Sequence, residues 1–251
     1  MILNHPDLWI SSLPQPSADG HKYNRGHTVI FGAPELTGAT RLAAESCARM
    51  GAGLVTVIGG DKADIYRATL PAHILVRDQA LPDMSKVTAC LMGSGGMPAQ
   101  IPQIPDNIPV IRDAEAITPG TIFSPQTILT PHDGEFARAF PHITGTRAEK
   151  AMAAAKMTGA VMVYKGAQTV IAHPDGRAVV NDCPVPYLAT AGSGDVLAGM
   201  MTGLAAQGMK PFESALAGVY IHAHMAKNQG AGLVASDLLG LIPGFLRSLG
   251  L

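Results

Sequence analysis

The sequence predicts an α/β fold with a mainly parallel central sheet, helices on both faces and an antiparallel hairpin at one edge. Short β-rich runs alternate with helix-like segments, which is typical of parallel strands joined by helices. Two late strand-like runs flank Pro174-Asp175-Gly176, a good hairpin turn. Of the 251 residues 47% are apolar, enough for a sizeable core, and this length favours a single domain over residues 1–251.

The first half of the chain follows the strand–helix alternation. Residues 1 to about 20 contain three prolines and are expected to form an irregular arm. Strands are expected at 27–31, 54–58, 73–76, 87–92 and 108–111, and helices at 38–53 and 61–70. The proline-rich stretch 97–110 is interpreted as a surface connection, not a domain boundary.

The second half begins with strands and ends in helices. Strands are expected at 127–130, 161–166, 169–173 and 177–180, and helices at 134–140 and 146–159. The last third is expected to be mostly helical from residue 194 or 195 onward. Pro211 lies near one predicted helix start, and Pro243 is expected to interrupt another helix.

Charge and composition exclude several classes of function. The net charge is −1 with no block of like charge, so neither a nucleic-acid nor an anionic-membrane partner is suggested. No apolar stretch approaches the roughly 20 residues of a membrane span, and the N-terminus lacks signal-peptide features. Cys47, Cys90 and Cys183 have no metal-site spacing and fit a reducing cytoplasm, with the first two expected in the core. We therefore expect a cytoplasmic location.

The stretch "AGSGDVLAGMM" predicts an anion site at a helix start. Gly192, Ser193 and Gly194 precede an apolar helical pattern, and the first N–H groups of a helix have no helical acceptor. Glycines let such amides approach a phosphate, and the helix dipole favours negative charge there. Gly199 and Gly203 share one face of this helix and would let another element approach closely.

Asp195, inside this anion site, has two interpretations. As a structural residue it would cap the helix. As a functional residue it would be a base, kept ionised by the dipole, that takes a proton from a hydroxyl beside a phosphate and so promotes phosphoryl transfer. "GSGD" alone is a weak signal.

Two further segments can likewise be interpreted as either structural or functional. In "TPHDGEFARAF" the structural interpretation is that Asp133 caps a short helix and His132 is an exposed loop residue, whereas the functional one places His132 against a substrate. In "YKGAQTVIA" Lys165 and Gly166 leave a strand and Thr169 enters the next, so they form either a plain hairpin or a phosphate-binding turn. No dedicated metal motif is present; His222 and His224 diverge on a helix and are interpreted as structural.

Five segments together closely resemble the ADP- or ATP-dependent NAD(P)H-hydrate dehydratases of the ribokinase-like superfamily. They are "HKYNRGHTVI", "TGATRLAAESCARMGAGLVTV", "LTPHDGEFARAF", "YKGAQTVIAHPDGRAVVN" and "LATAGSGDVLAGMMTGLAAQG". Their order and spacing cover nearly the whole chain after the arm. The resemblance implies a ribokinase-like three-layer sandwich.

The resemblance also implies a reaction. Reduced nicotinamide dinucleotides that have become hydrated on the ring are restored by these enzymes. The added hydroxyl is phosphorylated by the nucleotide, phosphate departs, and electrons from the ring nitrogen re-form the double bond. The family implies the S form of the hydrate, Mg²⁺ bridging the phosphates, and ADP or ATP as co-substrate, with the sequence pattern favouring ADP.

Site residues follow by position from the resemblance. Asp195 corresponds to the base and to a hydrate contact. The other hydrate contacts correspond to Ala39, Gly95 and His132, and the nucleotide contacts to Lys165, Gly166, Ala167, Gln168, Thr169 and Gly194. The chain departs from the family pattern at Ser94, where proline is usual, at Met97, where the last glycine is usual, and at Arg112, which precedes Asp113 in a normally apolar strand end.

The resemblance implies partners, and alternatives stay open beside it. It implies a homotetramer that cooperates with a separate NAD(P)H-hydrate epimerase, for which 251 residues leave no room. The alternatives are a ribokinase-like kinase of a small alcohol or vitamin precursor and a nucleotide-binding protein without turnover. A dinucleotide-dependent oxidoreductase and a P-loop enzyme are disfavoured because their glycine spacings are missing.

Overall fold

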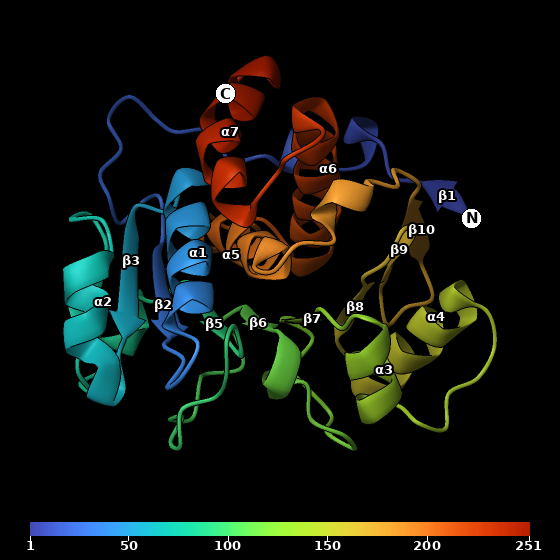
Figure 1. Ribbon diagram of the computed structural model, residues 1–251, viewed down its shortest axis with the longest axis horizontal. Coiled ribbons are helices and arrows are strands. Elements are labelled where there is room, and N and C mark those ends of the chain that lie inside the picture. The colour runs from blue at the N-terminus through green and yellow to red at the C-terminus, as the bar shows by residue number, and fades with distance from the viewer.

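The computed structural model describes residues 1–251 and contains one ten-stranded sheet (Figure 1). The strands are β1 (Ile2–Leu3), β2 (His27–Phe31), β3 (Leu54–Ile58), β4 (Leu75–Arg77), β5 (Ala89–Met92), β6 (Val110–Arg112), β7 (Thr127–Leu129), β8 (Val161–Tyr164), β9 (Thr169–Ala172) and β10 (Ala178–Asn181). Their order across the sheet is β1-β10-β9-β8-β7-β6-β5-β2-β3-β4. Strands β2 to β8 pair in parallel, whereas β8, β9 and β10 pair antiparallel. The predicted parallel sheet with an edge hairpin is confirmed.

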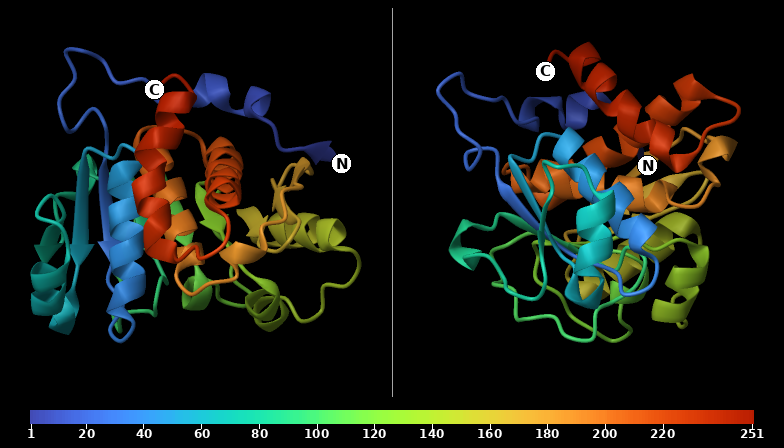
Figure 2. Two further views of the ribbon diagram at one scale, coloured as in Figure 1. Left: turned by 45° about the horizontal axis from the view of Figure 1, so that its top comes forward. Right: turned by 60° about the vertical axis from the view of Figure 1, so that its left-hand side comes forward.

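Seven α-helices cover the two faces of the sheet. They are α1 (Thr37–Arg49), α2 (Ala63–Thr69), α3 (Asp133–Ala139), α4 (Arg147–Thr158), α5 (Ser193–Ala206), α6 (Pro211–Gln229) and α7 (Ala235–Ser248). Helices α1, α5, α6 and α7 pack together on one face (Figures 1 and 2). Helices α3 and α4 cover the other face below β8 and β9, and the loops between residues 81 and 117 cover the rest of it.

The strands read as continuous apolar runs because both faces are buried. In β2, Ile30 faces the cluster formed with α1, α5, α6 and α7, whereas Val29 and Phe31 face the opposite cluster. In β8 the same alternation directs Val163 to the first face and Met162 toward α3 and α4. The parallel strands end at one edge of the sheet, where α1, α3 and α5 begin.

Helix α5 approaches α1 unusually closely. A Cβ added at Gly199 would lie 2.1 Å from Ala43 O and 2.1 Å from Ser46 Oγ, and one at Gly203 would lie 2.5 Å from Cys47 O. The expectation that these two glycines permit close approach is therefore confirmed. The Ser46 hydroxyl also donates to Val196 O at 3.0 Å, which fixes the start of α5 against α1.

The N-terminal arm is more ordered than expected. Its first residues form β1, which pairs with β10 (Figure 1). Trp9 is fully buried, with its ring 5.5 Å from that of Tyr220. Asn4 Nδ2 donates to Asn181 Oδ1 at 3.1 Å and to Leu216 O at 2.9 Å. Residues 13–20 contain no helix or strand, as expected of an irregular arm, whereas residues 2–12 are ordered by side chains far along the chain.

The expected interruption at Pro243 is also wrong. Helix α7 continues through Pro243, although proline removes one backbone hydrogen bond from a helix interior. The apolar face formed by Leu238, Leu239 and Ile242 is buried against the other helices, and this packing stabilises the helix on both sides of the proline. None of the seven helices is both long and apolar enough to cross a membrane.

The close contact between α1 and α5 gives a stability prediction. Gly199→Ala should lower the free energy of unfolding by about 1–3 kcal/mol or more, because the added methyl group overlaps the backbone of α1. Gly240→Ala in α7 is the matched control, since a Cβ there meets nothing within 4 Å. This substitution should raise the free energy of unfolding by about 0.5–1 kcal/mol, because alanine favours the helix more than glycine does. Urea unfolding followed by circular dichroism measures both, and equal effects would contradict the packing argument.

Candidate active site

Polar side chains meet where β6, β7 and β8 end. Lys165 Nζ lies 2.9 Å from Asp113 Oδ1 and 3.8 Å from Glu135 Oε2. The Thr130 hydroxyl donates to the same Asp113 oxygen at 2.6 Å. Asp113, Thr130 and Lys165 each follow a buried parallel strand, and the carboxyl ends of such strands share one edge, where ligands of open α/β sheets bind.

The start of α5 faces this cluster. Gly192 is the N-cap residue with φ of 89°, and a Cβ there would lie 2.5 Å from Leu42 Cδ1, so glycine is required. The backbone N–H groups of Gly194 and Asp195 have no acceptor in the protein. A Cβ at Gly194 would lie 3.3 Å from Lys165 Nζ. Unpaired amides and an ammonium group therefore converge on one point, an arrangement that suits an anion.

Asp195 does not cap the helix. It occupies the third helical position, and the helix begins at Ser193, slightly earlier than expected. The capping interpretation of Asp195 is therefore wrong, and its carboxyl group is left for another role.

The pKa of Asp195 is set by its burial and by the charged groups around it. Burial and the negative charge of Asp113 raise the pKa of Asp195 to about 6, against the opposing effects of Ser94 and Lys165. Desolvation and the neighbouring carboxylate cause this rise, and neither could be seen in the sequence around Asp195. A carboxylate with a pKa near 6 is ionised at neutral pH and yet accepts a proton more readily than an ordinary one.

Lys165 and Asp113 are held in their charged forms by each other. Burial alone would lower the pKa of Lys165, but Asp113 and Glu135 together raise it above its ordinary value. Burial alone would raise the pKa of Asp113, but Lys165 and Thr130 lower it. The ammonium group is therefore a permanent positive charge at the start of α5.

His132 is the N-cap residue of α3. Its Nδ1 accepts from Gly134 N at 3.0 Å and from Glu135 N at 3.3 Å, while Glu135 Oε2 accepts from His132 N at 2.8 Å. The interpretation that Asp133 caps this helix is therefore wrong. Asp133 instead accepts from Arg147 Nη2 at 2.7 Å.

The turn from Lys165 to Thr169 is closed by its own hydrogen bonds. The Thr169 hydroxyl accepts from Gly166 N at 3.2 Å and donates to Gly166 O at 3.0 Å. Arg147 Nη1 donates to Lys165 O at 2.8 Å, so α4 supports the turn. The Gln168 amide points away and donates to Asp182 at 2.9 Å.

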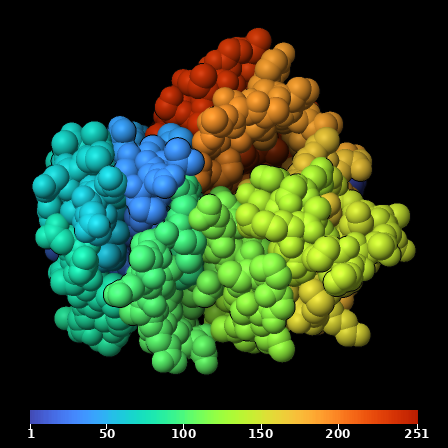
Figure 3. Space-filling model, turned by 60° about the horizontal axis from the view of Figure 1, so that its bottom comes forward, coloured from blue at the N-terminus to red at the C-terminus, as the bar shows by residue number.

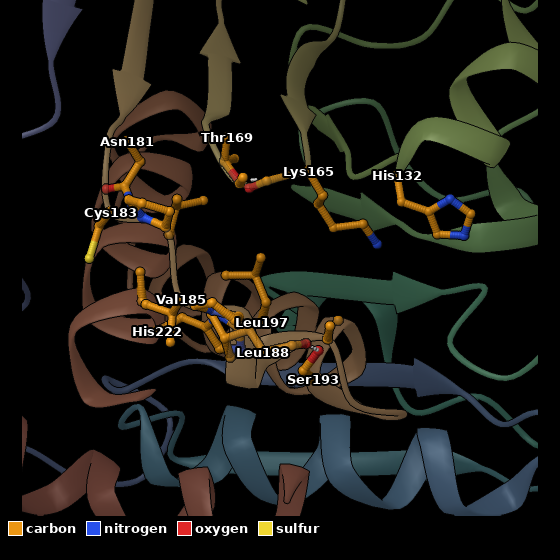
Figure 4. Close-up of a pocket in the computed structure, with 18 of the residues that line it drawn as sticks. His132, Lys165, Thr169, Asn181, Cys183, Val185, Leu188, Ser193, Leu197 and His222 are labelled. Atoms are coloured by element: carbon orange, nitrogen blue, oxygen red, sulfur yellow. Dashed lines mark hydrogen bonds between the residues drawn. The ribbon is translucent and has the colours of Figure 1, made fainter. Parts of the chain in front are cut away.

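A cavity of about 820 Å³ opens beside these groups (Figures 3 and 4). Its wall includes these predicted nucleotide and substrate residues: His132, Lys165, Gly166, Ala167, Thr169, Ser193 and Gly194. Gln168 and Gly192 do not line it. Lys165 and His132 lie at one end of the cavity, and Val185, Leu188 and His222 surround its apolar end (Figure 4).

Ala39 and Gly95 lie together, outside the wall of this cavity. A Cβ at Gly95, whose φ is 83°, would lie 2.8 Å from Ala39 Cβ and 2.4 Å from Leu36 O. The preceding Ser94 accepts from Thr40 Oγ1 at its backbone oxygen, and its buried hydroxyl makes no short hydrogen bond but lowers the pKa of Asp195. The departure from proline at 94 thus places a hydroxyl near the carboxylate.

The departure at Arg112 lies outside the polar cluster. Its guanidinium lies 5.0 Å from the centre of the Phe123 ring, and burial lowers its pKa. The next residue, Asp113, provides the ion pair with Lys165. Met97 packs against the apolar cluster of β2, β5 and β6.

Asp113, Thr130, Glu135 and Arg147 are the site residues that the sequence did not assign. The available signal was a polar residue directly after each apolar strand, as in "VIRD" and "TILT". His222, interpreted as structural, is buried with its ring in the cavity wall; its Nε2 has no partner, and burial lowers its pKa to about 4. His224 fits that interpretation, with Nδ1 2.8 Å from Tyr220 O.

The cluster can accommodate a divalent cation that is held mainly by the phosphate groups of a bound substrate. No group of three His, Cys, Asp or Glu side chains forms a metal cage. However, the carboxyl groups of Asp113, Glu135 and Asp195 surround the single ammonium of Lys165, and this surplus of negative charge contributes to the raised pKa of Asp195. Mg²⁺ in phosphoryl-transfer sites is usually held by one or two carboxylates and the substrate phosphates, which fits this charge balance.

Three kinds of comparison bear on this site. A sequence model described as NAD(P)H-hydrate dehydratase matches residues 27–242. A bifunctional NAD(P)H-hydrate repair enzyme of Moorella thermoacetica is 36% identical over 278 residues, covering 95% of this chain and 52% of that protein. This chain thus spans about half the length of such bifunctional relatives. An ADP-dependent (S)-NAD(P)H-hydrate dehydratase of Xanthomonas campestris is 32% identical over 273 residues, covering 94% and 93% of the two chains.

The solved structures agree with the sequence matches. The crystal structure of the ADP/ATP-dependent NAD(P)H-hydrate dehydratase of Bacillus subtilis, co-crystallised with ATP/Mg²⁺, has a TM-score of 0.85 at 26% identity over 99% of this chain and 98% of that one. With residues 27–242 inside the family model, this chain belongs to the NAD(P)H-hydrate dehydratase family and has its ribokinase-like fold.

Proposed function

We propose that this protein dehydrates the S form of NAD(P)H hydrate back to NAD(P)H at the expense of ADP or ATP, as a step of nicotinamide nucleotide repair. One observation carries the proposal: a carboxyl group with a raised pKa lies beside unpaired helix N-terminal amides and a buried ammonium group. This arrangement places a base next to a phosphate site. Family membership supplies the substrate class.

In the first half of the reaction Asp195 is the base. It takes the proton of the ring hydroxyl, whose oxygen attacks the terminal phosphorus of the nucleotide and displaces AMP from ADP, or ADP from ATP. The amides of Gly194 and Asp195 and the Lys165 ammonium stabilise the negative charge of the phosphoryl group in transfer. Ala39, Gly95 and His132 hold the hydrate against Asp195.

In the second half the phosphorylated carbon loses its substituent. The lone pair of the ring nitrogen expels inorganic phosphate with the C–O bond electrons, and loss of a proton from the neighbouring carbon restores the ring double bond. Phosphorylation is needed because hydroxide is a poor leaving group. The amide site that bound the transferred phosphoryl group also suits the departing phosphate.

The nucleotide occupies the cavity beside the turn from Lys165 to Thr169. Mg²⁺, when bound, neutralises phosphate charge, and Glu135 and Asp195 would be its protein contacts, mostly through water. The apolar end of the cavity, with Val185, Leu188 and His222, suits a purine base. The R form of the hydrate would first need a separate epimerase activity.

The proposed activity is tested with hydrated NADH. Enzyme, Mg²⁺ and either ADP or ATP should restore the absorbance of the reduced nicotinamide, and omission of nucleotide should abolish the recovery. A kinase of a small alcohol, or a nucleotide-binding protein without turnover, gives no recovery with either nucleotide. That outcome would exclude the dehydratase.

The base is tested by Asp195→Asn. We expect kcat to fall by about 10²–10⁴-fold, the usual contribution of a general base. The Kd for ADP, measured by isothermal titration calorimetry, should stay within about threefold, because the amide site is unchanged. Asp175→Asn in the β9–β10 turn is the matched control and should leave kcat unchanged. Near-normal turnover of Asp195→Asn would remove this residue from the role of base.

The raised pKa of Asp195 predicts the pH profile. Protonation below about pH 6 removes the base, so kcat/KM should fall tenfold per unit below that pH and level off above it. Asp113→Asn removes a negative neighbour and should move this acidic limb to lower pH. Initial rates of dehydration between pH 4.5 and 8 measure the shift. An acidic limb that stays in place would show that Asp113 does not tune the base.

A further inference from the structure

A pair of buried asparagines joins the N-terminal arm to the wall of the proposed nucleotide cavity. Asn181 is 4% exposed and lines this cavity at the end away from His132 (Figure 4). Asn4, in the arm, is 9% exposed and donates to Asn181 Oδ1 at 3.1 Å. Neither asparagine has a role in the reaction described above.

The position of Asn181 in β10 directs its side chain toward α6. Alternate residues of a strand share one face of the sheet, and Val179, two residues earlier, belongs to the core cluster that includes α6. Val219 and Ala223 of α6 line the same cavity as Asn181. The Asn181 amide therefore lies between the sheet and α6, at the edge of the cavity.

The hydrogen bonds of Asn4 determine which atom of the Asn181 amide faces the cavity. Asn4 Nδ2 donates to the backbone oxygen of Leu216 at 2.9 Å, and a carbonyl oxygen only accepts, so the nitrogen of Asn4 must lie on this side. The same nitrogen donates to Asn181 Oδ1. Asn181 Nδ2 donates no hydrogen bond within the protein and is not fully enclosed by it. Asn181 thus presents a hydrogen-bond donor to the cavity.

We propose that Asn181 binds the purine base of the nucleotide through its amide nitrogen and that Asn4 fixes the orientation of this amide. This inference rests on the proposed function, which places the base at the apolar end of this cavity. The ring nitrogens at the edge of a purine accept hydrogen bonds from such a donor. Val185 and Leu188 supply apolar surface for the base, and one donor among apolar side chains fixes how the base is oriented.

Asn4 does not line the cavity and is a positioning residue. Without it the Asn181 amide is free to turn over, and its oxygen would then face the lone pairs of the base. Asn4 also ties the arm to α6 through Leu216 O. The N-terminal arm therefore contributes to nucleotide affinity without touching the nucleotide.

The test compares two ligands by isothermal titration calorimetry in the presence of Mg²⁺. Asn181→Asp keeps an oxygen for Asn4 but replaces the donor that faces the cavity by an acceptor, so it should weaken ADP binding about tenfold or more. Inorganic pyrophosphate has no base and should bind this variant and the native protein equally. Asn4→Ala should weaken ADP binding by about threefold to tenfold and leave pyrophosphate binding unchanged.

Two controls separate recognition of the base from effects of charge and folding. Asn228→Asp makes the same change of charge at an exposed position of α6 outside the cavity wall, and it should bind ADP like the native protein. Trp9 is the single tryptophan and is fully buried, so its fluorescence shows whether the arm of Asn4→Ala stays docked. If that arm undocks, Asn181→Asp decides the proposal, because it retains the contact with Asn4.

Native-like ADP affinity of Asn181→Asp would overturn the proposal. An equal loss of ADP and pyrophosphate binding would also overturn it, because charge alone would then explain the effect. Neither result bears on the dehydratase, which is measured separately by the recovery of NADH from its hydrate. Loss of ADP binding but not of pyrophosphate binding, in a protein without turnover, would support the contact with the base and refute the dehydratase instead.

Discussion

The ion pair between Lys165 and Asp113 is the interaction on which the site depends. It joins the ends of β6 and β8, and Thr130 from β7 adds a hydrogen bond to the same carboxylate, so three strands are tied together at one edge. The pair is nearly buried, with side chains 18% and 6% exposed. Removing either partner would leave an uncompensated charge in the interior. The same pair sets the charge felt by Asp195 and the position of the ammonium group beside Gly194.

The second requirement is the position of α5. Its amides are useful only if they face Lys165, and that orientation comes from the glycines that let α5 lie on α1 and from the αL conformation of Gly192. The packing of α5 on α1 and the charge of Lys165 therefore both act on the backbone N–H groups at the start of α5. Helix packing in the core and chemistry at the edge are coupled through a single element.

Local features were predictable from the sequence, and long-range ones were not. Strands β2 and β3 match their predicted residues, and the glycine run before an apolar helix located the start of α5, because these signals lie within a few neighbouring residues. Asp113 was not assigned because its partner lies 52 residues away in the chain. The raised pKa of Asp195 was not predicted, because it sums burial and charges from several elements. The continuity of α7 through Pro243 likewise depends on packing partners.

The pairing of β1 with β10 has a consequence for biosynthesis. Asn4 reaches Asn181 across a sequence separation of 177 residues, so this segment acquires its partners only after residue 181 has been synthesised. Until then Trp9 has no pocket to enter, because Tyr220 is translated still later. Docking of residues 2–9 therefore follows the synthesis of their partners in β10 and α6, which come after the parallel strands β2 to β8 in the chain.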